Sequence, residues 1–156
     1  MYQIRFAESR DIPVILDLLR QVGQVHHDVR PDLFRDGAQK YDTPALEALL
    51  TNRDRPIFVA ESEGRVEGYC FCIRKSTKAD PVLWDQEELY IDDLCVDEAS
   101  RGKGTAQALY AHVVAYARET GCDSVTLNVW EGNDRARAFY EKQGLTPRKT
   151  MMEYRL

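Results

Sequence analysis

Several features that would assign a protein to a common class are absent from this sequence. No apolar run approaches the roughly 20 residues that a membrane helix needs, so we expect no membrane partner. The net charge of −5 argues against a partner of nucleic acid, because nucleic-acid-binding domains are normally basic. The cysteines show no paired Cys-x-x-Cys spacing and no nearby histidines, so we expect buried thiols and no metal; they are Cys70, Cys72, Cys95 and Cys122.

The sequence also contains no internal repeat, low-complexity tract or long linker. A length of 156 residues fits one domain with a substantial core, given the usual range of about 100 to 200 residues. We therefore expect residues 1–156 to form a single domain. Residues 1–6 alternate polar and apolar side chains, as a strand does and a signal peptide does not, which favours a cytoplasmic protein.

Two familiar phosphate-binding motifs are missing as well. No run of glycine, four residues, glycine, lysine and serine or threonine occurs, which excludes a Walker-type loop. A dinucleotide-binding fingerprint begins at Gly102 and Gly104, but Gln107 occupies the position of its third glycine. Only about 50 residues remain after it, too few to complete a doubly wound sheet.

What the sequence does contain is a glycine-rich junction between an apolar strand-like run and a strongly helical one. Its residues are Arg101, Gly102, Lys103, Gly104, Thr105 and Ala106. Glycines allow a tight turn and a close approach to a ligand, and the first amides of a helix lack intrahelical acceptors. Those amides and the positive end of the helix dipole favour an anion such as phosphate. A plain strand-to-helix turn with solvated basic side chains is the alternative reading.

Hydrophobic periodicity predicts an alternating order of strands and helices. We expect strands over residues 2–7, 57–62, 66–73, 88–96, 124–130 and 151–155. We expect helices from residue 10 to about 23–27 and over 44–50, 104–120 and 133–143, with an irregular stretch at 28–41 and a polar connection at 75–86. The order predicts a three-layer α/β or α+β fold.

Three motifs in this order resemble the GNAT superfamily of acetyl-CoA-dependent N-acetyltransferases. They are Leu94-Cys95-Val96-Asp97, the loop at 101–106, and Asn133-x-x-Ala136-x-x-Phe139-Tyr140-Glu141-Lys142-x-Gly144-Leu145. The resemblance covers about residues 88–146. It implies an α/β (α+β) three-layer fold whose mixed, mostly antiparallel sheet has about six to seven strands and about four flanking helices. The sheet would be splayed between its fourth and fifth strands.

The resemblance also implies the cofactor, acetyl-CoA. Its diphosphate would lie on the amides of Arg101, Gly102, Lys103, Gly104, Thr105 and Ala106. Its pantetheine arm would pair with the backbone of Leu94, Cys95 and Val96, because diverging strands leave N–H and C=O groups free. Asn133 would help to hold that arm, or would only cap the helix that follows it.

For catalysis the resemblance points to Tyr140, which matches the tyrosine that protonates the leaving thiolate; simple core packing is the alternative. The acceptor amine must lose a proton, since an alkylamine with a pKa of about 10.4 is mostly ammonium at neutral pH. Asp92 and Asp93 are the candidate bases, with Asp92 favoured. Strand alternation predicts that they point to opposite faces, so that only one lines the cleft. Solvated strand-end carboxylates are the alternative.

The sequence gives the least information about the binding site of the acceptor. Some GNAT members carry a carboxylate where this chain has Asn128, which can position a substrate but cannot act as a base. His26 and Phe34 lie in the region that lines the acceptor pocket of GNAT proteins. We expect transfer to a primary amine, with a small cationic amine or polyamine favoured over a peptide N-terminus or lysine. The alternatives are transfer of another acyl group and a non-catalytic acyl-CoA-binding module. The final strand offers an edge for a homodimer.

Overall fold

A computed structural model describes residues 1–156. One sheet has five strands in the order β1-β2-β3-β4-β5; their bounds are β1 Gln3–Phe6, β2 Ile57–Ser62, β3 Arg65–Thr77, β4 Gln86–Val96 and β5 Ser124–Leu127. The helices are α1 Ile12–Val29, α2 Thr43–Leu50, α3 Thr105–Glu119 and α4 Asp134–Lys142, with short 3-10 turns at Ser9–Asp11 and Glu98–Ser100. Neighbouring strands are antiparallel except β4 and β5, which are parallel. The mixed, mostly antiparallel sheet that we predicted is confirmed.

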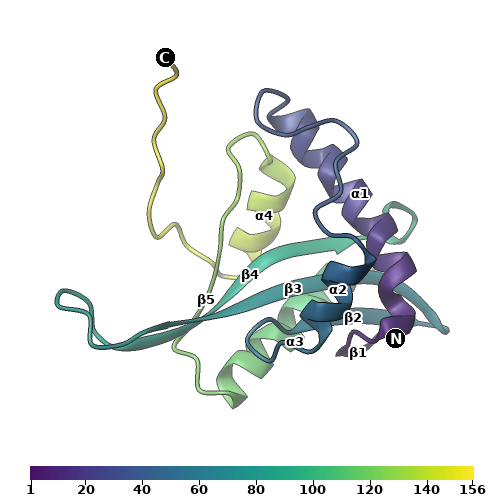
Figure 1. The fold of residues 1–156 in the computed structure, drawn as a ribbon, viewed down its shortest axis with the longest axis horizontal. Coiled ribbons are helices and arrows are strands. Elements are labelled where there is room, and N and C mark those ends of the chain that lie inside the picture. The colour runs from purple at the N-terminus through teal and green to yellow at the C-terminus, as the bar shows by residue number, and fades with distance from the viewer.

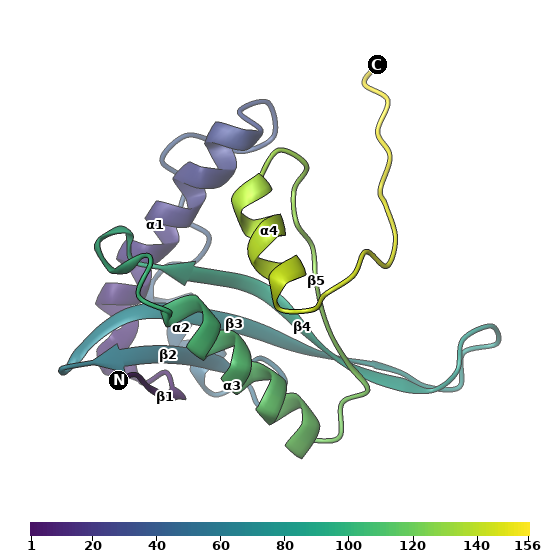
Figure 2. The same ribbon diagram turned by 180° about the vertical axis from the view of Figure 1, so that it is seen from behind.

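Helices cover both faces of the sheet, which gives the three layers (Figures 1 and 2). α1 and α2 lie on one face and α3 and α4 on the other. Alternating residues of β3 supply both sides: Tyr69 and Phe71 join the core under α1 and α2, whereas Cys70 and Cys72 join the core under α3. This two-sided burial explains why the middle of β3 reads as a continuous apolar run. The buried thiols that we predicted are confirmed for both cysteines and for Cys95.

The sheet has five strands where we expected about six to seven. Residues 151–155 form no strand, because no neighbouring segment of the chain pairs with them. β5 ends at Leu127 and not at residue 130, because β4 pairs with it only from Glu88 to Ile91. Beyond that point the two strands diverge, so the predicted splay between the fourth and fifth strands is present.

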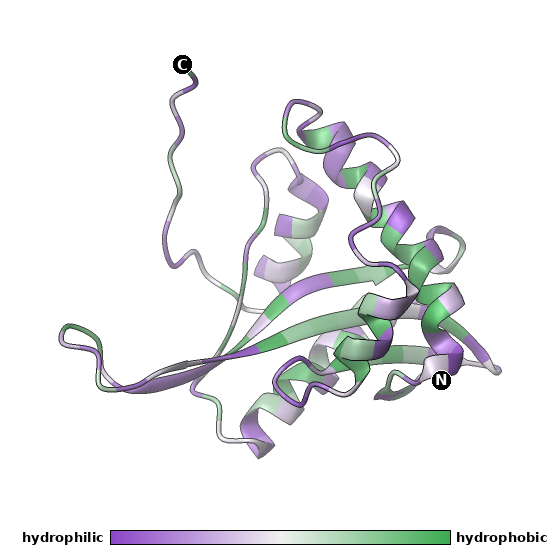
Figure 3. Ribbon diagram, viewed as in Figure 1, coloured by the Kyte–Doolittle hydropathy of each residue, from purple (hydrophilic) through white to green (hydrophobic).

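The prediction of a polar connection at residues 75–86 is wrong. β3 and β4 continue through it as an antiparallel pair from Lys75–Glu88 to Thr77–Gln86, and the turn occupies residues 78–85. The ribbon projects from the body of the molecule and is hydrophilic along most of its length (Figure 3). A two-stranded ribbon in solvent has no apolar face to bury, so its sequence shows no strand-like alternation. We call it the β3–β4 arm. The first helix also extends past the predicted 23–27, to Val29.

Neither a membrane-spanning helix nor a metal-binding cluster is found in the structure. No helix is both long enough and apolar enough to cross a membrane. No group of three or more histidine, cysteine, aspartate or glutamate side chains could hold a metal ion.

Candidate functional site

The glycine loop turns directly into α3. Gly102 and Gly104 have φ angles of 80° and 87°, a left-handed conformation that glycine adopts at little cost. Gly104 is the N-cap of α3, and no side chain caps the helix there. No backbone amide from residue 102 to residue 107 donates a hydrogen bond within the protein. These amides are therefore available to a ligand, as at other anion-binding helix N-termini.

The space in front of the loop is open. A Cβ placed on Gly102 or Gly104 would meet no atom within 4 Å. Arg101 and Lys103 form no ion pair, so both cations are free to meet an anion. The side chain of Thr105 is different, because its hydroxyl is buried and has no hydrogen-bond partner. The loop thus offers its backbone and two charges, and the residues fit a diphosphate group.

Next to this loop, β4 has an unpaired edge. Residues 93–96 pair with β3 on one side, and none of residues 92–96 pairs with β5 on the other. Leu94, Cys95 and Val96 lie in this stretch, as the sequence predicted. The Cys95 side chain points toward α1, where its thiol contacts the Leu18 carbonyl oxygen at 3.5 Å. Only the backbone of Cys95 is therefore available to a ligand at this edge of β4.

A β-bulge in β4 changes the geometry of the two acidic residues. Phe71 of β3 pairs with Asp93 and Cys72 pairs with Ile91, so Asp92 is the extra residue. The bulge places both carboxylates on the α1–α2 side of the sheet. Asp92 Oδ2 accepts a hydrogen bond from Lys40 Nζ at 2.5 Å, in the connection between α1 and α2. The prediction that Asp92 and Asp93 point to opposite faces is wrong, because strict alternation holds only in a strand without a bulge.

Asp93 is partly buried, and its pKa departs from the ordinary value of a carboxyl group. Burial raises its pKa and a hydrogen bond lowers it; burial is the larger effect, so the pKa is about 6. That bond is donated by the hydroxyl of Tyr69, which lies 2.6 Å from Asp93 Oδ2. A carboxyl group that titrates near neutral pH is suited to accept and release a proton in catalysis.

Lys40 was not among the predicted site residues. It lies in an irregular segment without periodicity, so no sequence pattern pointed to it. Burial lowers its pKa, but the hydrogen bond to Asp92 and the negative charges of Asp92 and Asp93 together outweigh burial, so the net shift is upward. Burial and the charge of Lys40 both lower the pKa of His26, which keeps its imidazole neutral at pH 7. Lys40 thus places a primary ammonium group directly on the Asp92 carboxylate.

Aromatic rings from three segments meet at the end of α1. The ring centroids of His26 and Phe34 are 4.9 Å apart, and those of Phe34 and Trp130 are 5.2 Å apart. His26 belongs to the end of α1, and Trp130 to the connection between β5 and α4. The predicted pair His26 and Phe34 is therefore brought together, and Trp130 completes an aromatic wall. We call these three residues the aromatic wall.

Asn128 follows β5 and contacts β4. Its Nδ2 donates to the hydroxyl of Tyr90 at 3.1 Å. Tyr90 was also missed, although it precedes Asp92 by two residues and period-2 alternation could have placed it beside that acid. In this structure Asn128 therefore positions a β4 tyrosine across the β4–β5 junction.

Tyr140 lies on α4, half-buried among other rings. Its ring centroid is 5.1 Å from that of Phe139 and 6.4 Å from that of Tyr110. Burial raises its pKa, and the nearby Cys70 and Asp93 add to the shift, so its hydroxyl stays protonated. Asn133 caps α4, because its side-chain oxygen accepts from the Ala136 amide at 3.2 Å. The capping role that the sequence allowed for Asn133 is thus present.

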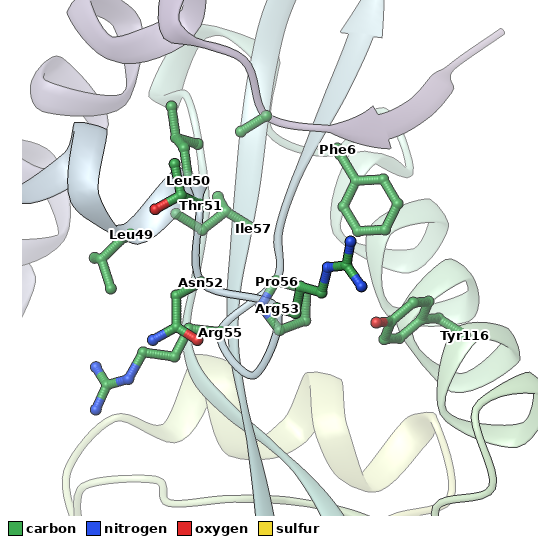
Figure 4. A pocket seen from close by; sticks show the side chains of 11 residues that line it. Phe6, Leu49, Leu50, Thr51, Asn52, Arg53, Arg55, Pro56, Ile57 and Tyr116 are labelled. Atoms are coloured by element: carbon green, nitrogen blue, oxygen red, sulfur yellow. The ribbon is translucent and has the colours of Figure 1, made fainter.

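A separate hollow of about 360 Å³ contains none of the predicted site residues. It lies where β1, the end of α2 and α3 approach one another. Figure 4 shows the rings of Phe6 and Tyr116 on one side of it, with Leu49 and Leu50 on the other. The chemistry-bearing side chains gather instead around the bulge of β4.

Comparisons with known proteins agree with this geometry. The model of the acetyltransferase (GNAT) family matches residues 22–145. A 5-NmdU N-acetyltransferase of Pseudomonas phage PaMx11 is 36% identical over 90 residues, which are 58% of this chain and 56% of the phage protein. The chain thus spans little more than half the length of that relative. The uncharacterized N-acetyltransferase YhfO of Bacillus subtilis is 29% identical over 90% of this chain and 87% of its own.

Solved structures extend the comparison to the whole fold. A mutant of the BH1408 protein from Bacillus halodurans has a TM-score of 0.94 and 29% identity, over 99% of both chains. An aminoglycoside acetyltransferase from an uncultured soil metagenomic sample, in complex with sisomicin, has a TM-score of 0.76 and 19% identity over 99% of this chain and 95% of its own. The second likeness concerns the fold alone. Since the family model covers most of the chain, including the glycine loop, the bulged strand and α4, this protein belongs to the acetyltransferase (GNAT) family.

Proposed function

We propose that this protein transfers an acetyl group from acetyl-CoA directly to a primary amine. One observation carries the proposal: the free amides of residues 102–107 adjoin the unpaired edge of β4, where Asp92 and Asp93 lie side by side. A diphosphate would bind the amides beside Arg101 and Lys103. The amides of a pantetheine arm would pair with the backbone of Leu94 and Val96.

In this proposal the two carboxylates have different tasks. Asp93 acts as the general base, directly or through a water molecule, because its raised pKa of about 6 lets it hold a proton near neutral pH. Asp92, which we favoured from the sequence, is held by Lys40 and instead anchors the ammonium group of the acceptor. Once the amine has lost its proton, its lone pair can form the new bond to the acetyl carbon.

Tyr140 acts as the general acid for the leaving thiolate. Acetyl-CoA supplies an acetyl group activated as a thioester, and the C–S bond breaks as the C–N bond forms. The Tyr140 hydroxyl is protonated and has no hydrogen-bond partner within the protein, so it is free to donate its proton to the departing sulfur. A phenol with a normal pKa of about 10 and a thiol of about 8.5 are close enough for such transfer, and burial, which raises the pKa of Tyr140, would raise the pKa of a thiol released beside it as well.

The ion pair between Lys40 and Asp92 supports the proposal that the acceptor is cationic. A primary ammonium already occupies the position beside Asp92, which indicates that a substrate ammonium would fit there. The aromatic wall would contact the rest of such an acceptor. We therefore favour a small cationic amine or a polyamine, and a peptide N-terminus or a lysine side chain offers the same ammonium group.

Calorimetric titration with coenzyme A, followed by a thiol-release assay over a panel of amines, tests the proposal. We expect binding, and turnover with at least one cationic amine. Binding without turnover on any acceptor would favour a non-catalytic acyl-CoA-binding module. Absence of binding would overturn both functions.

A further inference from the structure

The lysine that pairs with Asp92 belongs to a segment without regular structure. Residues 30–42, between α1 and α2, form no helix or strand, and the main chain of Lys40 forms no backbone hydrogen bond. The segment runs from the end of α1 back to α2, on the face of the sheet that carries the acids (Figure 1). The Lys40 side chain is 48% exposed and carries its ammonium group on a flexible four-carbon stem. Lys40 can therefore move locally without the loss of any helix or strand pairing.

The ammonium group of Lys40 lies where the proposed function places the acceptor. Its Nζ is 2.5 Å from Asp92 Oδ2, the carboxylate that would anchor an incoming ammonium. Asp93, the proposed base, follows Asp92 along β4, and its negative charge contributes to the raised pKa of Lys40. The folded chain thus brings together a primary amine, an anchoring acid and a base.

The groups that would serve the acetyl donor adjoin the same acids. Burial raises the pKa of Tyr140, and the charges of Cys70 and Asp93 add to the shift, so the phenol lies within electrostatic reach of the proposed base. The unpaired edge of β4 begins beside Asp93. A thioester bound along that edge, next to Tyr140, would lie near the base with which Lys40 also interacts.

We propose that Lys40 is itself an acceptor of the acetyl group, and that its acetylation opens the site to other amines. This inference rests on the proposed function. Lys40 Nζ first gives a proton to Asp93, and its lone pair then forms the C–N bond to the acetyl carbon as the C–S bond breaks. Tyr140 donates its proton to the departing sulfur. The nitrogen loses a second proton as the amide forms, and this proton restores the Tyr140 hydroxyl through solvent, so the products are acetylated Lys40 and free coenzyme A.

Acetylation changes what Asp92 can bind. An acetylated lysine has lost its positive charge and can no longer form an ion pair with a carboxylate. The modified side chain therefore stops competing with a cationic acceptor for Asp92. The unmodified chain inhibits itself, and the first acetyl group that it transfers removes the inhibition.

Lys78 provides a matched comparison within the same chain. Its Nζ also lies beside a carboxylate, 3.4 Å from Glu87 Oε1, but it belongs to the turn of the β3–β4 arm. Its side chain is 71% exposed, against 48% for Lys40. Uncatalysed acetylation by acetyl-CoA should therefore favour Lys78, whereas transfer within the site favours Lys40.

Peptide mass spectrometry of the protein after incubation with acetyl-CoA, without added acceptor, tests the proposal. We expect Lys40 to be acetylated at least tenfold faster than Lys78, and at least tenfold more slowly in Tyr140→Phe than in the unsubstituted protein. The rate constant should not depend on protein concentration, because donor site and acceptor belong to one chain. Acetylation of Lys40 no faster than that of Lys78 would overturn the proposal, and so would an equal rate in Tyr140→Phe or a rate constant that rises with protein concentration.

Calorimetry without acetyl-CoA tests the opening of the site, with spermidine as the cationic probe. Protein acetylated at Lys40 and freed of coenzyme A should bind spermidine several-fold more tightly than unmodified protein. Lys40→Gln, which carries a neutral amide at this position, should match it. Lys78→Gln removes the same charge from the arm and should leave the affinity unchanged. An affinity that neither acetylation nor Lys40→Gln alters would contradict the opening of the site.

The failure of this inference differs from the failure of the proposed function. Turnover of an external amine while Lys40 stays unmodified would overturn the inference and leave the proposed function in place. Absence of coenzyme A binding would overturn both.

Discussion

Replacing Tyr69 with phenylalanine should move the acid limb of the pH–rate profile. The Tyr69 hydroxyl donates to Asp93 Oδ2 at 2.6 Å and stabilises the ionised carboxylate. A hydrogen bond to a charged group contributes about 1.5–3 kcal/mol, which corresponds to about 1–2 pKa units at 1.36 kcal/mol per unit. The pKa of Asp93 should therefore rise from about 6 to about 7–8 in Tyr69→Phe.

The sign of the effect follows from the role of Asp93 as a base. The ionised form is active, so a higher pKa lowers kcat/KM at low pH and leaves it unchanged well above the new pKa. At pH 6 about half of Asp93 is ionised in the unsubstituted protein, against roughly 1–9% in the variant. We expect kcat/KM to fall about 5- to 50-fold at pH 6 and to recover above about pH 9.

The assay is thiol release measured as kcat/KM from acidic to alkaline pH. Tyr41→Phe is the matched control: it also removes a hydroxyl close to the site, since the Tyr41 ring stacks on Phe71 at 5.7 Å, but the Tyr41 hydroxyl bonds to neither acid. An acid limb that stays in place in Tyr69→Phe would refute the assignment of Asp93 as the base. So would an equal loss of activity at every pH, which would indicate a structural defect.

Three further substitutions separate binding from chemistry. Tyr140→Phe should lower kcat at least tenfold while calorimetry shows an unchanged Kd for coenzyme A; an unchanged kcat would remove Tyr140 from the mechanism. Gly104→Ala should weaken coenzyme A binding in the same titration. Gly37, with φ 65°, is the matched control, because alanine is strained at both positions. Each substitution should destabilise the fold by ~1–2 kcal/mol, but Gly37→Ala should leave coenzyme A binding unchanged. Lys40→Met should lower the KM of cationic amines several-fold, because it removes the internal ammonium from Asp92; a higher KM would contradict that role.

Local chemistry made much of the fold predictable from sequence. The glycine loop specifies its own conformation, because positive φ angles and free helix amides are properties of a few adjacent residues. The helices over 105–119 and 134–142 followed from apolar spacing and, for the second, from the cap at Asn133. The antiparallel pair of β2 and β3 followed from the turn at residues 63–64.

The features that sequence could not reveal depend on partners distant along the chain. The contact between Lys40 and Asp92 joins residues 52 positions apart and follows from no local pattern. The β3–β4 arm is held by backbone pairing between two polar stretches, whose side chains carry no signal of it. Residues 151–155 have the alternation of a strand, yet form none, since no segment of this chain pairs with them.

The bulge at Asp92 accounts both for the unpaired edge of β4 and for the position of the acidic pair. Pairing of β4 with β5 stops at Ile91, immediately before the extra residue, because a bulge bends its strand and increases the local twist. The same residue brings two adjacent carboxylates to one face. Deleting Asp92 would leave every other β3–β4 pair in register, so the chain should still fold, but with a straighter β4 alongside β5.

That deletion should therefore abolish coenzyme A binding in calorimetry, while thermal unfolding remains cooperative. Asp92→Ala keeps the extra residue and hence the bulge, so it should retain coenzyme A binding and raise only the KM of the acceptor. If both variants bound coenzyme A equally well, the divergence of β4 and β5 would have to come from the connection that follows β5, and the bulge would serve only to orient the acids.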